Sequence, residues 1–210
     1  MKNTLLVLAI ATTIAIVNAS TVLAQQSAQQ TIEAARAKAQ ETGIYREALA
    51  DPDQSVRLAT FEAMIGSKDP ILVELALENG LASSDRVLRG LAFRHAILSR
   101  STLVLNIAAD PSAGQSNVEK TKKYIAEHGN QLTIRLYKVD MNTGSFEGAT
   151  MRARVVGNVS GLVIDYGNYG NVGGSTKGRL ALQEDGTVGG MVFETDSQIG
   201  GQFLANATIR

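Results

Sequence analysis

The chain has 210 residues, of which 44% are apolar and 19% are charged, as in an ordinary globular protein with room for one large domain or two small ones. Its twenty basic and twenty acidic side chains cancel, so no basic patch typical of a nucleic-acid-binding protein is expected. The absence of cysteine excludes disulfides, thiolate chemistry and cysteine-ligated zinc.

The first residues have the pattern of a secretory signal peptide. Lys2 supplies a positive charge, and residues 5–17 form the apolar core. Small residues at 22–24 favour cleavage after that run, and 17–19 offer a weaker alternative. The apolar run is shorter than the roughly 20 residues of a membrane span, which favours a cleaved signal over a retained anchor. The sequence thus predicts a signal peptide at 1–24 and a periplasmic or secreted protein without a stable membrane span.

The next part of the chain predicts helices. Good helix formers dominate 25–42, and a short helix is expected at 44–50. Asp53 is placed to cap the helix that follows it. Residues 71–78 are apolar on nearly every side, which is typical of a buried helix, and 102–109 are expected to return as a further helix.

Within this part, the segment 51–98 contains a repeat of 32 residues. It reads DQSVRLATF from Asp53 and DRVLRGLAF from Asp85, a spacing typical of stacked helical hairpins. The pattern of an aspartate followed by a Val-Arg or Leu-Arg pair resembles the HEAT-repeat family, over about a quarter of the chain. The resemblance implies that Arg57 and Arg89 bind the aspartate or turn carbonyls of a neighbouring repeat; contact with a partner protein is the alternative.

The sequence changes character after a linker at 110–114. A helix is expected at about 117–128, opened by a capping box that starts at Ser116. Beyond residue 132, frequent glycines and alternating apolar residues predict five or six short antiparallel strands. The pair at 185–186, Asp-Gly, is a strong hairpin signal.

These elements predict an α+β fold. N-terminal α-helical hairpin repeats of the HEAT type are expected to precede a C-terminal antiparallel β meander, closed as a small barrel or folded as a sandwich. The predicted domains are the signal peptide at 1–24, a helical-repeat domain at 25–112 and a β domain at 113–210. Whether the helix at 117–128 packs on the repeats or on the β domain is left open.

No motif in the sequence carries recognisable catalytic chemistry. The chain has no Gly-x-Ser-x-Gly elbow, phosphate-binding loop or His-Glu-x-x-His pair, and its two histidines lie in separate segments. We therefore predict no enzymatic activity, no cofactor and no metal site.

The best candidate binding segment is the glycine-rich loop at 165–175. It contains Tyr166, Asn168, Tyr169 and Asn171, residue types that combine flat apolar faces with hydrogen-bonding ends. The same residues also suit simple turn geometry between strands.

Two functional hypotheses follow, and a hydrolase is a third that no motif supports. The first is an exported, non-enzymatic interaction protein of the cell envelope that binds a protein partner through its helical repeats. The alternative is a β domain that binds a glycan or a small molecule through the loop at 165–175, with the helices as scaffold. Nucleic acid is not expected as a partner.

Overall fold

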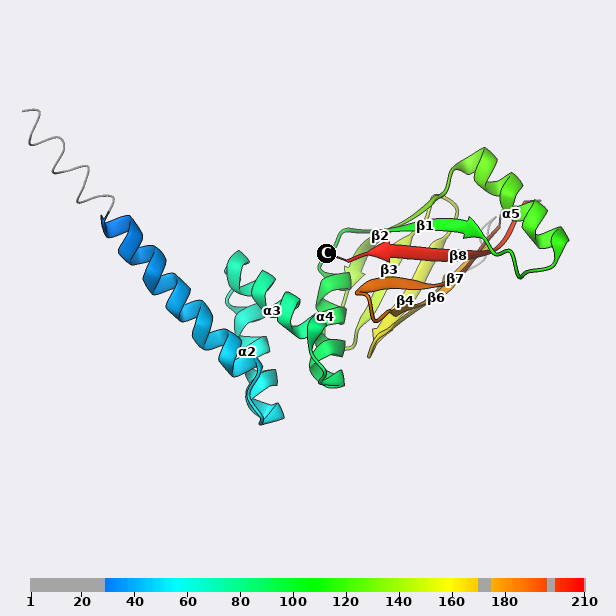
Figure 1. The fold of residues 1–210 in the computed structure, drawn as a ribbon. Helices are drawn as coiled ribbons and strands as arrows, with labels where there is room; N and C mark the ends of the chain where they lie inside the picture. The colour runs from blue at the N-terminus through cyan, green and yellow to red at the C-terminus, as the bar shows by residue number, and fades with distance from the viewer. Residues whose placement is uncertain (1–28, 170–174, 196–198, 210) are drawn as a thin grey trace, which may run out of the picture. The chain divides into compact units, whose positions relative to one another are not determined.

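A computed structural model describes residues 29–169, 175–195 and 199–209. The chain divides into two compact units at the boundary between Ala50 and Asp51. The described part of the first unit is a helix at 29–49. The second unit contains the helices α2 (Gln54–Gly66), α3 (Pro70–Ala82) and α4 (Arg86–Leu98), followed by a β-barrel (Figure 1). Within the described ranges, no helix is both long enough and apolar enough to cross a membrane.

The barrel has eight antiparallel strands, and each strand pairs with its neighbour in the sequence until β8 returns to β1. A helix, α5 (Gln115–His128), joins the first two strands. Closure leaves no unpaired strand edge. The strands are β1 (Thr102–Ala109), β2 (Gln131–Val139), β3 (Ser145–Ala149), β4 (Arg154–Ser160), β5 (Val163–Asn168), β6 (Ser175–Leu182), β7 (Thr187–Thr195) and β8 (Gly200–Thr208).

The interior of the barrel is the hydrophobic core. Side chains on a strand point alternately to the two faces, so every second residue faces inward. Each fully buried aliphatic or aromatic side chain contributes roughly 1.5–3 kcal/mol relative to an exposed one. Inward apolar side chains of the barrel with almost no exposure include Leu105, Ile134, Val155, Val159, Ile164, Leu180, Val188, Val192 and Phe203.

Helix α4 covers one end of the barrel. Phe93, Ile97 and Leu98 on this helix belong to the same hydrophobic cluster as the inward strand residues. Gly90 lies against the turn between β4 and β5, where an added Cβ would come within 3.3 Å of the Cα of Gly161. In Figure 1 α4 is the one of the helices α2–α4 nearest the strands.

Helix α5 packs at the opposite end of the barrel. The ring of Tyr124 lies 5.2 Å from the ring of Phe203 on β8, and Thr121 is fully buried. Asn117 holds the start of β8, since its side chain bonds the backbone N–H and carbonyl of Gln202. The helix at 117–128, whose packing was left open, therefore belongs to the barrel.

The predicted fold class is wrong. The helices do not form an independent stack of hairpin repeats before a β meander, because they pack against a closed barrel of eight strands. Residues 102–109 form strand β1 rather than a helix, and β1 lies before the predicted domain boundary at 112. Its alternate residues Leu103, Leu105 and Ile107 face the core. A short apolar run fits both a buried helix and a buried strand, so the sequence pattern alone could not distinguish them.

Three predictions about the C-terminal half can be compared with the structure: the antiparallel strands, the hairpin at 185–186 and the capping box at Ser116. The antiparallel pairing is confirmed, and the pair at 185–186 does connect β6 to β7. Only Gly186 has a positive φ, 80°, so this turn is not of type I′. Helix α5 is confirmed, but it begins at Gln115 after Gly114, which has no side-chain cap, so the capping box predicted at Ser116 is wrong.

Candidate functional site

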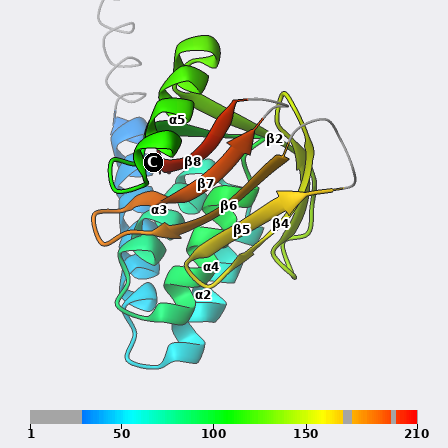
Figure 2. The same cartoon turned by 90° about the vertical axis from the view of Figure 1, so that its right-hand side faces the viewer.

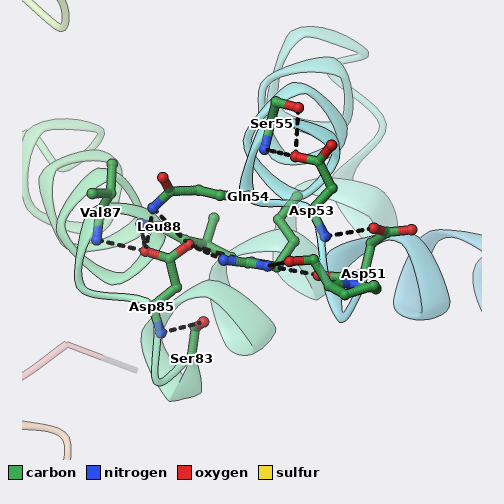
Figure 3. A network of polar contacts seen from close by, with 10 residues as sticks. Asp51, Asp53, Gln54, Ser55, Ser83, Asp85, Val87 and Leu88 are labelled. Atoms are coloured by element: carbon green, nitrogen blue, oxygen red, sulfur yellow. Dashed lines mark hydrogen bonds and ion pairs between the residues drawn. The ribbon is translucent and has the colours of Figure 1, made fainter.

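Arg57 holds two helices of the second unit together, because its guanidinium binds Asp85 at the start of α4. Figure 3 shows the polar network around Asp85. Its Nη2 lies 2.6 Å from Oδ2 of Asp85, and its Nη1 donates to the carbonyl oxygens of Asp51 and Pro52 at 2.6 and 3.0 Å. The bond to Asp85 is the contact with a neighbouring copy that the resemblance implied for Arg57, whereas the two carbonyl oxygens belong to the turn before its own helix. The guanidinium therefore has a structural role between α2 and the turn before α4.

Asp85 is the centre of that network. It caps α4 by accepting from the backbone N–H of Val87 at 2.9 Å, and it accepts from Gln54 Nε2 at 3.1 Å. The hydrogen bond from Arg57 is the largest of the effects that lower the pKa of Asp85 to about 2. The carboxylate is thus charged and fully engaged near neutral pH.

Arg89, the second arginine of the repeat, contacts the barrel instead. Its Nη2 donates to the carbonyl oxygen of Gln183 in the β6–β7 turn at 3.0 Å. Arg94, one turn further along α4, donates to the carbonyl oxygen of Asn142 in the β2–β3 turn at 2.8 Å. The two repeat arginines are therefore not brought together, and both have intramolecular partners.

The residues predicted in the loop at 165–175 do not form one site. Tyr166 is only 6% exposed and points into the barrel, whereas Tyr169 is 58% exposed. The Asn168 side-chain oxygen accepts from the backbone N–H of Thr176 at 2.5 Å, so it serves the pairing of β5 and β6. Asn171 lies outside the described residues.

A groove of about 340 Å³ lies on the outer face of strands β5 to β8. These four strands lie side by side in that order in Figure 2. The residues whose side chains face outward in it alternate with the inward core residues on the same strands. They are Asp165, Lys177, Arg179, Met191, Phe193 and Gln202.

Strand register arranges these side chains in two rows. Lys177 lies opposite Phe193, and Phe193 lies opposite Gln202 on β8. In the second row Arg179 lies between Asp165 and Met191. Each row therefore combines polar groups with an apolar side chain at its centre or end.

The charged groups of the groove are open to solvent. Arg179 Nη1 lies 3.0 Å from both carboxylate oxygens of Asp165, and the two side chains are 72% and 53% exposed. Such an exposed pair contributes little to stability. The Lys177 ammonium lies 5.3 Å from the centre of the Phe193 ring, and no carboxylate pairs with it among the described residues. The charged side chains of the groove are therefore accessible to a ligand and contribute little to the stability of the fold.

A buried polar cluster lies behind this groove, inside the barrel. Thr176 and Glu194 face each other across β6 and β7, and both are 0% exposed. The Glu194 carboxylate, the Thr176 hydroxyl and the Tyr166 hydroxyl have no hydrogen-bond partner among the described residues. Glu194 was not predicted as an inward residue, although it continues the inward alternation of Val188 and Val192.

Burial controls the charge state of this cluster. It raises the pKa of Glu194 to about 7, against the smaller lowering effects of Thr176 and Arg152. It also raises the pKa of Tyr166 well above its usual value. Thr176 affects the pKa of both neighbours, so its hydroxyl lies beside them, but neither contact has the geometry of a hydrogen bond.

His95 packs within the helical layer. Its ring lies 5.7 Å from the ring of Phe61 in an edge-on arrangement, and burial lowers its pKa. Among the described residues, no group of three or more histidine, aspartate or glutamate side chains is placed to hold a metal ion.

The fold and the groove together describe a small antiparallel β-barrel with a mixed polar and aromatic outer face. No family model matches the chain, and no curated protein or solved structure is significantly similar to it. The resemblance of residues 51–98 to HEAT repeats stays a prediction.

Proposed function

We propose that this protein is a non-enzymatic glycan-binding protein that takes a saccharide in the groove on the outer face of β5 to β8. The observation that carries the proposal is the aromatic face of Phe193 beside the solvent-exposed Asp165–Arg179 pair. A sugar ring has one apolar C–H face and a rim of hydroxyl groups. An aromatic ring complements the first, and charged or amide side chains complement the second.

The inventory of polar groups supports this choice. Lys177 and Arg179 donate hydrogen bonds, Asp165 accepts them, and Gln202 can do both. These side chains already lie in solvent, so binding does not require a buried charge to be uncovered. The groove is shallow for a ligand site, and we expect dissociation constants on the order of millimolar for a single sugar ring.

Removing the Phe193 ring is expected to weaken glycan binding. The chain 25–210 is first applied to an array of neutral and acidic oligosaccharides, and the ligands it retains are titrated by calorimetry. Phe193→Leu, which keeps an apolar side chain but removes the ring, is expected to raise the dissociation constant about 10-fold, or roughly 1.4 kcal/mol. Lys177→Ala and Gln202→Ala are expected to have smaller effects of the same sign.

Matched variants separate this groove from the loop predicted from sequence. Tyr137→Ala removes an exposed aromatic ring from β2, outside the groove, and is expected to leave affinity unchanged. Tyr169→Ala tests the loop without disturbing the core; Tyr166→Ala is unsuitable because that ring is buried. An unchanged dissociation constant for Phe193→Leu, or a loss confined to Tyr169→Ala, contradicts the groove.

We also propose that the protein acts outside the cytoplasm. The support is Lys2, the apolar run at 5–17 and the small residues at 22–24, all of which lie outside the described residues. When the natural chain is expressed in a Gram-negative host, the periplasmic fraction is expected to contain a protein that begins at Gln25. Leu8→Arg, in the apolar run, is expected to block this processing.

Mass spectrometry of the intact protein checks the export prediction. A mass that begins at Gln25 supports the main cleavage site, and one that begins at Ser20 supports the weaker site. Full-length protein confined to the cytoplasm, with no difference between the natural chain and Leu8→Arg, contradicts export.

A further inference from the structure

Helix α3 carries an apolar stripe that the fold leaves only half covered. Its buried face, which includes Leu72, Leu75 and Ala76, packs among the helices of the second unit. A second apolar row, formed by Val73 and Leu77 and continued by Leu81, is half-buried. Residues spaced by four lie one above the other on a helix, so this row forms a continuous stripe.

The stripe forms one wall of a groove with a volume of about 670 Å³. Ala96 and Ser99 near the end of α4, together with Arg100 and Ile209, form the other side. The residues 71–78 were expected to form a buried helix because they are apolar on nearly every side. The half-buried row explains why this helix is apolar on nearly every side although only one of its faces is fully buried. Its second apolar face lines the groove.

The rim of the groove is charged on one flank. Glu74 and Glu78 lie one turn apart beside the apolar stripe, and both are exposed. Neither carboxylate has an ion-pair partner in the part of the chain that the structure describes. The one cation of the groove, Arg100, lies on the other side, where its guanidinium donates to the carbonyl oxygens of Ala96 and Ile209. The α3 flank therefore presents uncompensated negative charge.

We propose that this groove binds an amphipathic helix of a partner protein whose apolar seam is flanked by lysine or arginine. An apolar groove accepts the i, i+3, i+4 and i+7 side chains of such a helix. The acidic flank selects a basic partner and fixes which edge of the incoming helix faces α3, because charge complementarity contributes mainly to specificity. The groove is lined by α3, by the end of α4 with the two residues after it, and by Ile209 after β8, so it shares no residue with the proposed glycan groove on β5 to β8.

Two synthetic peptides test the proposal on the chain 25–210. Each is a fluorescein-labelled amphipathic helix of about 18 residues, or five turns, with the same leucine seam. One carries lysine along its flank, and the other carries glutamate at the same positions. Fluorescence polarisation is expected to give at least about 10-fold tighter binding of the lysine peptide.

Charge reversal on the rim makes the test specific. The double variant Glu74→Lys/Glu78→Lys is expected to bind the glutamate peptide in preference to the lysine peptide. Both positions are exposed, so the fold is not at risk, and circular dichroism verifies it. The matched control Glu119→Lys/Glu127→Lys changes the same charge on α5, where only surface pairs with Lys122 and Lys123 are lost, and is expected to keep the original preference.

Three outcomes overturn the proposal. The first is equal binding of the two peptides to the natural chain. The second is an unchanged peptide preference in the Glu74→Lys/Glu78→Lys variant, and the third is a reversed preference in the α5 control. Sedimentation of the chain without peptide measures its oligomeric state, because a second copy of the chain is the other molecule that could occupy the groove. A dimer that dissociates in the Glu74→Lys/Glu78→Lys variant assigns the groove to a second copy of this chain and rejects a basic partner helix.

Discussion

Replacing Glu194 with glutamine is expected to stabilise the barrel by about 3 kcal/mol at pH 8 and to change its stability little at pH 4. The reason is that Glu194 is fully buried between β6 and β8 and its carboxylate lacks a hydrogen-bond partner among the described residues. Glutamine has nearly the same shape and carries no charge, so it removes only the cost of burying the ionised group.

The pH dependence follows from the direction of the shift. The pKa of Glu194 is raised from 4.5 to about 7 in the folded protein. Between these two values the folded state keeps a proton that the unfolded state has released. The free energy of unfolding therefore falls as the pH rises from 4.5 to about 7, and it is constant above that range as far as this group is concerned. Arg152 is the charged side chain that opposes the shift.

Urea denaturation at a series of pH values measures this effect. The difference in the free energy of unfolding between the natural chain and Glu194→Gln is expected to open across that window. A difference between the chain and Glu194→Gln that stays constant from pH 4 to pH 8 would show that the carboxylate has the same pKa in both states. The buried cluster would then need another explanation.

Gly178→Ala is expected to destabilise the barrel by about 1–3 kcal/mol, the usual cost of overpacking a core. Gly178 lies directly opposite Tyr166 across β5 and β6. A Cβ at this position would come within 2.4 Å of Cε1 and 2.8 Å of the hydroxyl oxygen of Tyr166. The glycine therefore provides the space in which the tyrosine ring enters the barrel.

A second-site change isolates this cause. In a Tyr166→Leu background the ring is absent, so adding Gly178→Ala is expected to cost little, and the two changes should be strongly non-additive in urea denaturation. Gly189→Ala is the control, because a Cβ there meets only the Gln183 side chain at ordinary contact distances of 3.5 Å or more. Equal costs of Gly178→Ala in both backgrounds would contradict the proposed clash.

The repeat in the sequence has a different meaning in the folded protein from the one its spacing suggested. Its two copies agree at the capping aspartates and at Arg57 and Arg89, but Leu58 of the first copy is replaced by Gly90 in the second, and Glu62 by Arg94. Gly90 is where α4 touches the β4–β5 turn, and Arg94 reaches the β2–β3 turn. The second copy therefore differs where it meets the barrel.

The candidate site was only partly predictable for a related reason. The sequence singled out the segment 165–175, of which Asp165 presents its side chain in the groove, and alternation along β7 could also have identified Glu194 as an inward carboxylate. The groove itself depends on which strands are neighbours. Asp165, Arg179 and Met191 form one row only because β5, β6 and β7 pair in a particular register, and a shift of one residue would reverse every face.

The sequence by itself determined the local features of this protein. The caps at Asp53 and Asp85, the antiparallel strands and the connection at 185–186 depend on residues within a few positions of one another, and such contacts leave a readable pattern. The tertiary structure alone decided that residues 102–109 are a strand and that the sheet closes, because β1 gains its second partner from β8, where Asn106 lies opposite Asn206. Burial and pairing against β8, about 100 residues away, outweigh the local helix preference of residues 102–109. A short apolar run adopts the helix or the strand according to which one satisfies its backbone N–H and C=O groups.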